Sequence, residues 1–499
     1  MCFRLLLAVA LTLGFVAYAQ VSQQPPPDQQ PSSSQPVAEP AAPPPSASTA
    51  QTQPSPAASS IPTEAAPAEV APASDQTDSS DYTGPGILTR GYTVSRLADR
   101  SLRFRPYLRF AGMSDDGLTS MSSSNGELEP VQSLGVEGGF GISGRKIFKN
   151  DIFELEFRGN VFHYGSNSAF DGTNFILDLN YQHSFTPHIL LALQEHVGQY
   201  STNYPLLNSA ADPSVGSTAV LVTPNTQLFD SRVFYASSAV DLQIAKSPRL
   251  SFDFGGSGFL TRQSSDQLYG LVGSQARVDV TYRLTRRTSV GAYYSYTNYI
   301  FTDQFGGSNI NTLGLIFSHS ISRTLEFRSR IGGSRAETRG IQVITLDPVI
   351  AAILGTPTGA VAIYARNYLA DVSAQLSKQM KRGGASISYA HGVSPGNGLY
   401  LTSKRDTIGA YYDYTGIKRY TFSAGATRDS LSSLGLGLGK YTSFIVSGGV
   451  ARVLGKGFQA DLHADYRHYD VSGAPFLQNA YRVSVGVEWT PSEKPLNIW

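Results

Sequence analysis

Cysteine, tryptophan and methionine are all scarce in this chain. Its 499 residues include 1 Cys, 2 Trp and 4 Met. The single thiol, Cys2, lies in an N-terminal segment that we expect to be removed, so a disulfide framework is excluded for the remaining chain. A thiol-free chain suits transit through an oxidising compartment, where a stray thiol is a hazard.

The chain also lacks a surplus of charge of either sign. Lys and Arg number 39 and Asp and Glu number 38, for a formal net charge of +1. Nucleic-acid-binding proteins normally carry a basic surplus on one face, so we expect no nucleic-acid partner. Mean hydropathy is −0.15. That value is typical of soluble proteins, but it is equally what strands of alternating polar and apolar residues average to.

Long apolar runs are missing after the first twenty residues. The nearest, residues 343–364, is interrupted by Asp347, Pro348 and Pro357. A membrane-spanning helix needs about 20 consecutive, mostly apolar residues, so a helical membrane protein is not expected.

The first residues have the composition of a secretory signal peptide. Arg4 supplies the positive charge, Leu5 to Val16 form a short apolar run, and Ala17-Tyr18-Ala19 fits an A-x-A cleavage site. We therefore predict a signal peptide over residues 1–19.

Residues 20–100 are predicted to be a disordered periplasmic linker. Residues 21–84 are rich in Pro, Ala, Ser and Gln and almost free of aromatics. Such a segment buries too little apolar surface to offset its ordering entropy. A plain spacer is the favoured interpretation. The alternative is a tether that contacts a periplasmic partner through residues 20–84.

From residue 101 to 499 the dominant pattern is a hydrophobic period of two. In DIFELEFRGNVFHY (151–164), Phe153, Leu155 and Phe157 alternate with Glu154 and Glu156. About eighteen such segments of 10 to 14 residues follow one another, with 16 as the second choice. Period two is the signature of β-strands that differ in polarity between their two faces.

The gaps between these segments alternate in length. Short gaps lie at 185–187, 245–249, 284–287, 320–323, 415–419 and 454–457, and long gaps at 113–130, 201–230, 335–365, 395–403, 429–438 and 471–478. Alternation of this kind predicts antiparallel up-and-down strands with tight turns at one rim and loops at the other. Within the gap 335–365, residues 348–354 would suit a short apolar helix or a hairpin, and a loop that constricts the interior is one hypothesis.

Segment length and aromatic placement favour a membrane barrel over a soluble sheet. Soluble strands usually have about 5 or 6 residues, whereas a tilted strand needs about 9–11 to cross the hydrocarbon. Aromatic residues stand at segment ends, as in Tyr481 and Trp489 or Phe458 and Tyr466, which is typical of interfacial girdles. The predicted fold is all-β: a transmembrane antiparallel up-and-down β-barrel preceded by the disordered Pro-rich segment.

Over residues 101–490 the chain resembles the Gram-negative outer-membrane β-barrel superfamily, in particular its porin-like members. YRVSVGVEWT (481–490) is similar to the C-terminal strand of that superfamily, which usually ends on its last aromatic residue. Here TPSEKPLNIW follows Trp489, so Trp499 is the other candidate for that aromatic. The resemblance implies an outer-membrane location, surrounding lipid, and insertion by the barrel-assembly machinery.

Motifs associated with catalysis or cofactors are better explained by barrel architecture. GFGISG (139–144) fits a dinucleotide-binding pattern but lies within one alternating strand, where glycines relieve crowding. GVSPG (392–396) fits a nucleophile elbow, but Pro395 prevents the helix that the elbow requires. The eight His residues are scattered, and His463 and His468 point to opposite strand faces. We therefore predict no enzymatic activity, no cofactor and no metal site.

Charged residues on the polar strand face are the candidate functional residues. An unpaired Lys or Arg facing lipid at the bilayer midplane costs about 2–4 kcal/mol, so these side chains should point inward. Their role is either to form cross-strand ion pairs that hold the wall or to screen solutes, and their mixed sign argues against strong ion preference. The predicted pore-lining residues are Glu154, Glu156, Arg158, Asp178, Asp241, Arg277, Asp279, Arg283, Glu326, Arg328, Arg330, Asp371, Asp413, Asp461, Asp465, Arg467, Arg482 and Glu488. Asp253 shares their polar parity.

The sequence as a whole predicts a channel in the outer membrane that passes small hydrophilic solutes. Two alternatives stay open at this point. One is an export barrel for a polymer such as an exopolysaccharide, working with a periplasmic partner. The other is a structural or adhesive surface protein in which the long loops do the work.

Overall fold

The computed structural model describes residues 105–121, 128–165, 171–201, 232–264, 268–302, 305–345, 356–396, 398, 401–434, 440–455, 457–472 and 476–490. The predicted signal peptide (1–19) and linker (20–100) lie outside these residues, as does the apolar segment 348–354.

The described chain is built from β-strands. They are β1 (Arg105–Met121), β2 (Leu128–Ile147), β3 (Asp151–Tyr164), β4 (Gly172–Thr186), β5 (Ile189–Ser201), β6 (Arg232–Ala245), β7 (Leu250–Gln263), β8 (Leu271–Arg283), β9 (Thr288–Phe301), β10 (Gly307–Ser320), β11 (Leu325–Thr345), β12 (Thr358–Met380), β13 (Gly383–Ser394), β14 (Ser403–Tyr414), β15 (Tyr420–Ser433), β16 (Tyr441–Gly455), β17 (Phe458–Val471) and β18 (Phe476–Trp489). Among these residues, no helix is long and apolar enough to cross a membrane.

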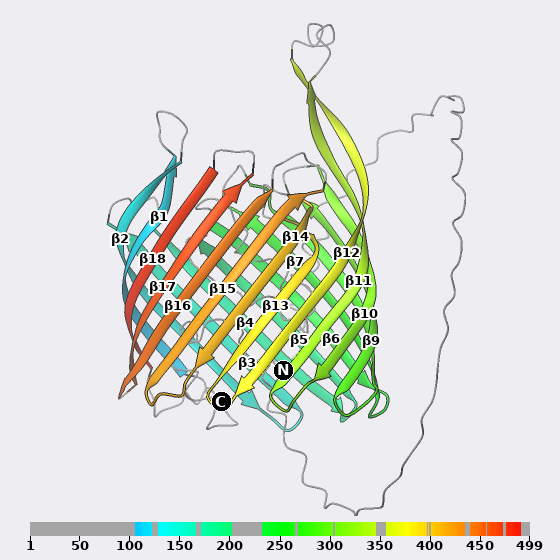
Figure 1. Ribbon diagram of the computed structural model, residues 1–499, viewed down its shortest axis with the longest axis horizontal. Coiled ribbons are helices and arrows are strands. Elements are labelled where there is room, and N and C mark those ends of the chain that lie inside the picture. Colours follow the sequence, from blue (N-terminus) through cyan, green and yellow to red (C-terminus); the bar gives the residue numbers. More distant parts are fainter. Residues whose placement is uncertain are drawn as a thin grey trace, which may run out of the picture. The chain divides into compact units, whose positions relative to one another are not determined.

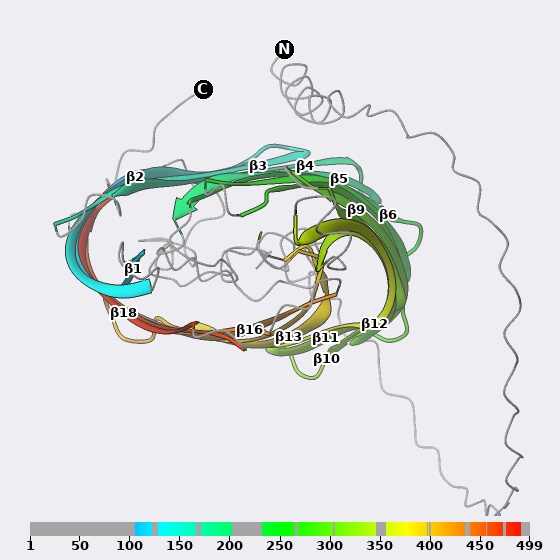
Figure 2. The ribbon, with the colours of Figure 1, turned by 90° about the horizontal axis from the view of Figure 1, so that it is seen from above.

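The strands form one closed antiparallel sheet. Each strand pairs with the next in sequence, and β1 pairs with β18 from Leu108↔Trp489 to Asp115↔Arg482. The result is an 18-stranded barrel of tilted strands (Figure 1), with an elongated oval cross-section when seen from above (Figure 2). The predicted fold class and the preferred strand number are confirmed. Closure on β18 also makes Trp489 the last strand residue.

Short turns connect the strands at one rim, as predicted. Residues 187–188, 246–249, 284–287, 321–324 and 415–419 are such turns, and 148–150 and 381–382 join them. Arg419 is a non-glycine residue with positive φ, at 70°. Turns this short join only antiparallel neighbours, so they fix the strand order around the barrel.

Two strand-length predictions were wrong. The gap predicted at 113–130 is largely strand, because β1 continues to Met121 and β2 begins at Leu128. The gap predicted at 335–365 is mostly a paired ladder of β11 and β12, from Arg335↔Tyr368 to Thr345↔Thr358, which extends beyond the neighbouring strands (Figure 1). Strand extensions outside lipid need no apolar face, so hydrophobic periodicity does not reveal them.

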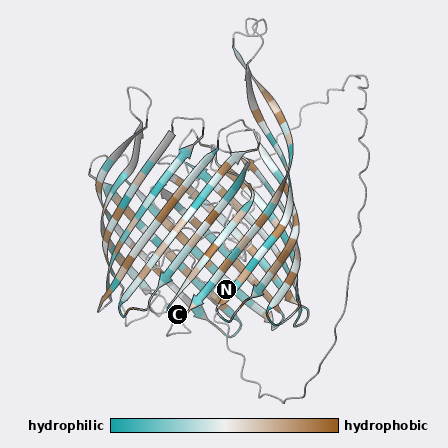
Figure 3. Cartoon of the chain, viewed as in Figure 1, coloured by the Kyte–Doolittle hydropathy of each residue, from teal (hydrophilic) through white to brown (hydrophobic). Residues whose placement is uncertain are grey.

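The two faces of the sheet differ sharply in composition. Large apolar side chains on one face are exposed, among them Phe110 at 76% and Leu134 at 73%. In β18, Val483, Val485 and Val487 are exposed, whereas the alternate residues, such as Arg482 and Glu488, are buried. Apolar and polar residues alternate over the whole wall (Figure 3). One face is therefore suited to lipid and the other is not.

The register that closes the barrel can be tested by cross-linking. Gly112 in β1 lies opposite Val485 in β18, and a Cβ added at Gly112 would have nothing within 4 Å. We expect the G112C/V485C variant of the folded protein to form a disulfide that shifts gel mobility until it is reduced. In the control G112C/V483C, the second cysteine is displaced by two residues, which puts the Cα pair beyond disulfide reach. Equal cross-linking of both variants would contradict the register.

Candidate functional site on the interior face of the barrel

Ion pairs that skip strands identify the polar face as the concave one. Arg330 in β11 donates from Nη2 to Asp279 Oδ2 in β8 at 2.9 Å, although β9 and β10 lie between. Tyr293 in β9 donates to Asp371 in β12 at 2.6 Å, across β10 and β11. Three inter-strand steps cover about 14 Å along the sheet. Side chains cross that span only where the wall curves towards them, so this face is the interior of the barrel.

The first group of interior charges, the β6–β12 cluster, consists of Asp241, Asp253, Arg277, Asp279, Arg330, Asp371 and the hydroxyl of Tyr293. Arg277 Nη2 lies 2.9 Å from Asp241 Oδ1 and 3.0 Å from Asp253 Oδ1, and its Nε lies 3.7 Å from Asp279 Oδ2. Its side chain is only 8% exposed, against 26% for Asp241 and 32% for Asp253. The guanidinium is therefore held beneath carboxylates that face the lumen.

Glycines in the wall make room for these long contacts. A Cβ built at Gly255 would lie 2.5 Å from Asp241 Oδ1 and 3.2 Å from Arg277 Nε. At Gly314 and Gly332 it would lie 2.6 and 2.8 Å from the Tyr293 side chain. Tyr293 therefore lies flat over two glycines on its way to Asp371, a close approach that any larger residue would obstruct.

The second group, the closure cluster, lies where β17, β18, β1 and β2 meet. Arg109 bridges Glu137 at 2.9 Å and Asp461 at 2.8 Å, passing Gly486, whose added Cβ would lie 3.1 Å from Arg109 Nη2. Arg467 lies 3.1 Å from Asp115 and 3.3 Å from Asp465. The remaining buried members are Arg482, His463 and Glu488. These pairs cross-link the first and last strands.

A third, smaller group lies on β3 to β5. Arg158 Nε is 2.9 Å from Glu156 Oε1 and Arg158 Nη2 is 4.0 Å from Asp178 Oδ2. Asp178 Oδ1 in turn lies 2.7 Å from His196 Nδ1. These side chains are between 16% and 38% exposed, so this group lies more open to the lumen than the closure cluster does.

All eighteen predicted pore-lining residues lie on the interior face, but they do not converge on one site. The β6–β12 cluster contains Asp241, Arg277, Asp279, Arg330 and Asp371. The closure cluster contains Asp461, Asp465, Arg467, Arg482 and Glu488. The β3–β5 group contains Glu156, Arg158 and Asp178. The others lie towards the short-turn rim: Glu154 in β3, Arg283 at the end of β8, Glu326 and Arg328, which pair at 2.8 Å, and Asp413 in β14.

Five interior charges escaped the sequence-based prediction, namely Arg109, Asp115, Glu137, Arg405 and Asp429. Asp115 and Asp429 fell in predicted gaps, although Asp429 accepts hydrogen bonds from Arg405 at 2.6 Å and from Thr407 at 2.6 Å. Arg109 and Glu137 lie in strands that the sequence did predict. Each follows an exposed apolar residue, Leu108 or Val136, so the alternation places both side chains on the interior face.

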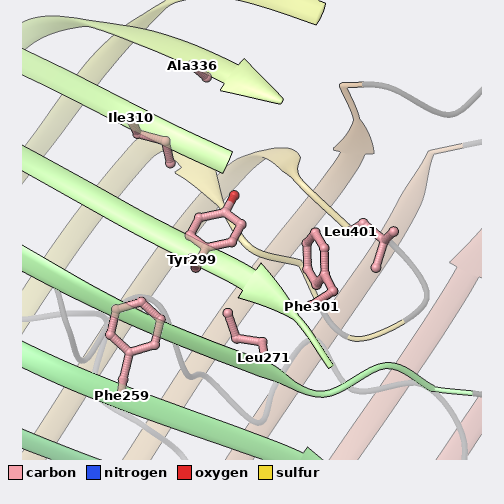
Figure 4. Close-up of a cluster of buried hydrophobic side chains, with 7 residues drawn as sticks. All are labelled: Phe259, Leu271, Tyr299, Phe301, Ile310, Ala336 and Leu401. Atoms are coloured by element: carbon pink, nitrogen blue, oxygen red, sulfur yellow. The ribbon is translucent and has the colours of Figure 1, made fainter. Parts of the chain in front are cut away.

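An apolar cluster fills part of the interior near the loop rim. It comprises Phe259, Leu271, Tyr299, Phe301, Ile310, Ala336 and Leu401 (Figure 4). Leu401 belongs to the connection between β13 and β14, which reaches across the barrel. Thr402 Oγ1 lies 3.2 Å from Tyr299 Oη and 2.6 Å from Ser308 Oγ, and the Gly398 carbonyl accepts a 3.1 Å bond from Tyr269 N.

The predicted constriction by segment 335–365 stays a prediction. Residues 335–345 and 358–365 are paired strands, but the apolar segment 348–354 lies outside the described residues. Among the described residues, the connection with Gly398, Leu401 and Thr402 contacts β9, β10 and the connection between β7 and β8. Its sequence carries little hydrophobic signal, because a single leucine anchors it and the other contacts use hydroxyls and backbone groups.

Carboxylates outnumber guanidinium groups among the described interior side chains. Strand parity places fifteen acidic side chains there, namely Asp115, Glu137, Glu154, Glu156, Asp178, Asp241, Asp253, Asp279, Glu326, Asp371, Asp413, Asp429, Asp461, Asp465 and Glu488. Among the side chains that the structure describes, nine arginines share this parity, namely Arg109, Arg158, Arg277, Arg283, Arg328, Arg330, Arg405, Arg467 and Arg482. The described interior side chains are thus net acidic although the whole chain is nearly neutral.

Two carboxylates on the outer face have close side-chain partners. Glu195, in the middle of β5, accepts a 2.5 Å bond from Ser238 Oγ in β6. Asp406 Oδ1 lies 2.5 Å from His391 Nδ1. Elsewhere the outer face exposes Leu, Val, Ile, Phe and Tyr side chains around a charged interior. An outer apolar face around a polar interior, in a sheet without an edge, is what a bilayer requires.

The chain is a closed 18-stranded antiparallel β-barrel with a mainly apolar outer face and a charged interior. No protein-family model matches the chain, and no curated protein sequence does.

Among solved structures, the barrel is similar to OpdQ of Pseudomonas aeruginosa at 13% identity and a TM-score of 0.37, over 79% of this chain and 99% of that one. It is similar to OccAB3 of Acinetobacter baumannii at 11% identity and a TM-score of 0.37, over 78% and 98%. Pseudomonas aeruginosa OccK2 (OpdF) in complex with glucuronate matches at 10% identity and a TM-score of 0.37, over 78% and 98%. With TM-scores this low, the account of this barrel rests on its own strand register and faces.

We predict that the β6–β12 cluster contributes to the stability of the folded barrel. Replacing Arg277 by Gln leaves Asp241, Asp253 and Asp279 close together without their shared cation. We expect R277Q to lower the free energy of unfolding by about 2–3 kcal/mol, measured by urea titration of the folded barrel in detergent. The matched control is R283Q on the same strand, at an exposed position on the short-turn rim. Equal stability of the two variants would show that the cluster does not hold the wall.

Proposed function

We propose that this barrel is a passive channel for small hydrophilic solutes in the outer membrane of a Gram-negative bacterium. The observation that carries the proposal is the closed 18-stranded sheet whose interior face is charged and hydroxyl-rich. Barrels of 16 to 18 strands are wide enough for an aqueous channel, whereas 8-stranded barrels are filled by their own side chains.

The interior charges divide into two roles in this proposal. Those of the closure cluster are buried and paired with one another, so they serve to hold the first and last strands together. Asp241, Asp253 and Asp178 are a quarter to a third exposed, so they are the groups that a passing solute meets. Solute screening therefore rests with the β6–β12 cluster and the β3–β5 group.

The contacts across the interior favour small solutes over a polymer. Tyr293 and Arg330 span several strands, and the connection carrying Leu401 and Thr402 crosses to β9 and β10. Each of these narrows the lumen. Polymer export and surface adhesion, the two alternatives raised by the sequence, have no comparable observation in their favour among the described residues.

Single-channel recording tests the proposal directly. The purified full chain, reconstituted in a planar bilayer, should give discrete conductance steps, and sugars of increasing size should reduce the conductance until they no longer enter. A protein that inserts, as judged by heat-modifiable gel migration, and yet carries no current would contradict the channel.

The acidic interior predicts a preference for cations. In a salt gradient, the reversal potential should have the sign of a cation-preferring channel. The D241N/D253N variant should move it towards zero, because these two carboxylates are the most lumen-exposed of their cluster. The matched control D406N removes a carboxylate from the outer face and should leave the potential unchanged. A wild-type potential of the opposite sign would refute this assignment.

We predict that the connection between β13 and β14 limits the conductance of the channel. Leu401→Ala removes the apolar anchor from the cluster around Tyr299 and Phe301, so the segment should withdraw from the interior and single-channel conductance should rise. Leu313→Ala, on the exposed outer face of β10, is the control. Unchanged conductance in a folded L401A barrel would show that this segment does not restrict the path.

A further inference from the structure

The short-turn rim has a composition unlike the rest of the barrel. Among its seven described turns, six carry Lys or Arg and none carries Asp or Glu. The turns 246–249, 284–287, 381–382 and 415–419 carry two basic residues each. These residues are exposed. The chain as a whole is nearly neutral, so the positive charge is concentrated at this rim.

Large apolar side chains stand beside these cations. Phe148, Leu284, Ile321 and Ile417 are each about half exposed, and each precedes a Lys or Arg by one or two residues. Phe148, Leu284 and Ile321 directly follow the last residues of β2, β8 and β10. They therefore lie at the boundary where the apolar outer face ends. The cations follow one or two residues later, in the turns beyond the strand ends.

The rim cations have few partners within the protein. Arg382 Nη1 donates to the Gly416 carbonyl of the neighbouring turn at 2.8 Å. Lys146, at the end of β2, places its Nζ 5.1 Å from the centre of the Phe148 ring. Within the described residues, no ion pair joins a Lys or Arg of these turns to a carboxylate. Like charges on neighbouring turns, when these turns carry no carboxylate of their own, are stabilised by anions from outside the chain.

We infer that this rim binds the anionic head groups of phospholipids in the leaflet that surrounds it. An apolar side chain that enters the interfacial region, followed by a cation at head-group depth, matches a lipid with an acyl chain and a phosphate. Arginine adds paired N–H donors that suit phosphate oxygens. A soluble polyanion would meet the charges but would leave the half-exposed Phe, Leu and Ile side chains in water, so lipid is the better match.

Tryptophan quenching tests the inference at one turn. In the full chain with W489F and W499F, L284W places the only Trp beside Arg286 and Arg287. The protein is reconstituted in vesicles in which either phosphatidylglycerol or phosphatidylcholine carries brominated acyl chains, mixed with the other lipid unbrominated. We expect the brominated phosphatidylglycerol to quench more strongly, for a relative affinity of about three- to tenfold at low salt.

The charge dependence decides the result. In the same background, R286Q/R287Q should bring the relative affinity to about one, whereas R286K/R287K should retain most of it. The control K440Q removes an exposed cation at the opposite end of the barrel, before β16, and should leave the preference intact. All variants are first checked for heat-modifiable migration, which reports folding.

Equal quenching by both lipids in the wild-type background would overturn the inference. So would a preference that survives R286Q/R287Q. If phosphatidylglycerol gives no preference and a soluble polyanion such as heparin instead shifts the Trp emission, the rim binds a polymer rather than lipid. None of these results depends on conductance, so failure here leaves the proposed channel untouched.

Discussion

Closure of the sheet between β1 and β18 is the constraint on which the rest of the structure depends. In hydrocarbon, no water satisfies an unpaired backbone N–H or C=O group, so a sheet survives only if it has no edge. The eight-residue pairing between Leu108–Asp115 and Arg482–Trp489 removes both edges at once. The closure cluster adds side-chain contacts on both sides of this pairing, since Arg109 in β1 reaches Glu137 in β2 and Asp461 in β17.

Closure gives the sheet an outer face suited to lipid and an interior face suited to water. The interior must then accommodate many charged side chains. Charged side chains need partners, and on a curved wall those partners lie one to three strands away. Long side chains therefore lie flat against the wall, and glycine is required where they cross it, as at Gly255 under Arg277 and at Gly314 under Tyr293. This arrangement hides guanidinium groups and leaves carboxylates facing the lumen. The proposed selectivity then depends on which member of each ion pair faces the lumen, and not on the composition alone.

The sequence predicts the barrel well because the relevant signal is local. Period two in β3 or β18 reports the two faces directly, and short polar gaps such as 284–287 report the tight turns. The predictions fail where that signal is absent. The halves of β11 and β12 near the loop rim, residues 335–345 and 358–368, lack the alternation, so most of this ladder was predicted as a loop.

The interior charges were only half predictable for a related reason. Parity shows which side chains point inward, but contacts such as Arg330 with Asp279 join strands separated by two others. No sequence spacing encodes which of the inward carboxylates a given arginine will reach. The connection with Leu401 and Thr402 escaped notice because hydroxyl and backbone contacts hold it in place, and these have no periodicity.

The most direct test of the account is the accessibility of single cysteines along β6. Ser237, Ala239 and Gln243 belong to the interior face, and Ala236 and Val240 to the lipid face. Each is replaced by Cys in the reconstituted full chain, and its reaction with a charged, water-soluble thiol reagent is timed. The account predicts fast labelling at the first three positions and little labelling at the other two. Equal labelling at all five would contradict a barrel with lipid outside and water inside.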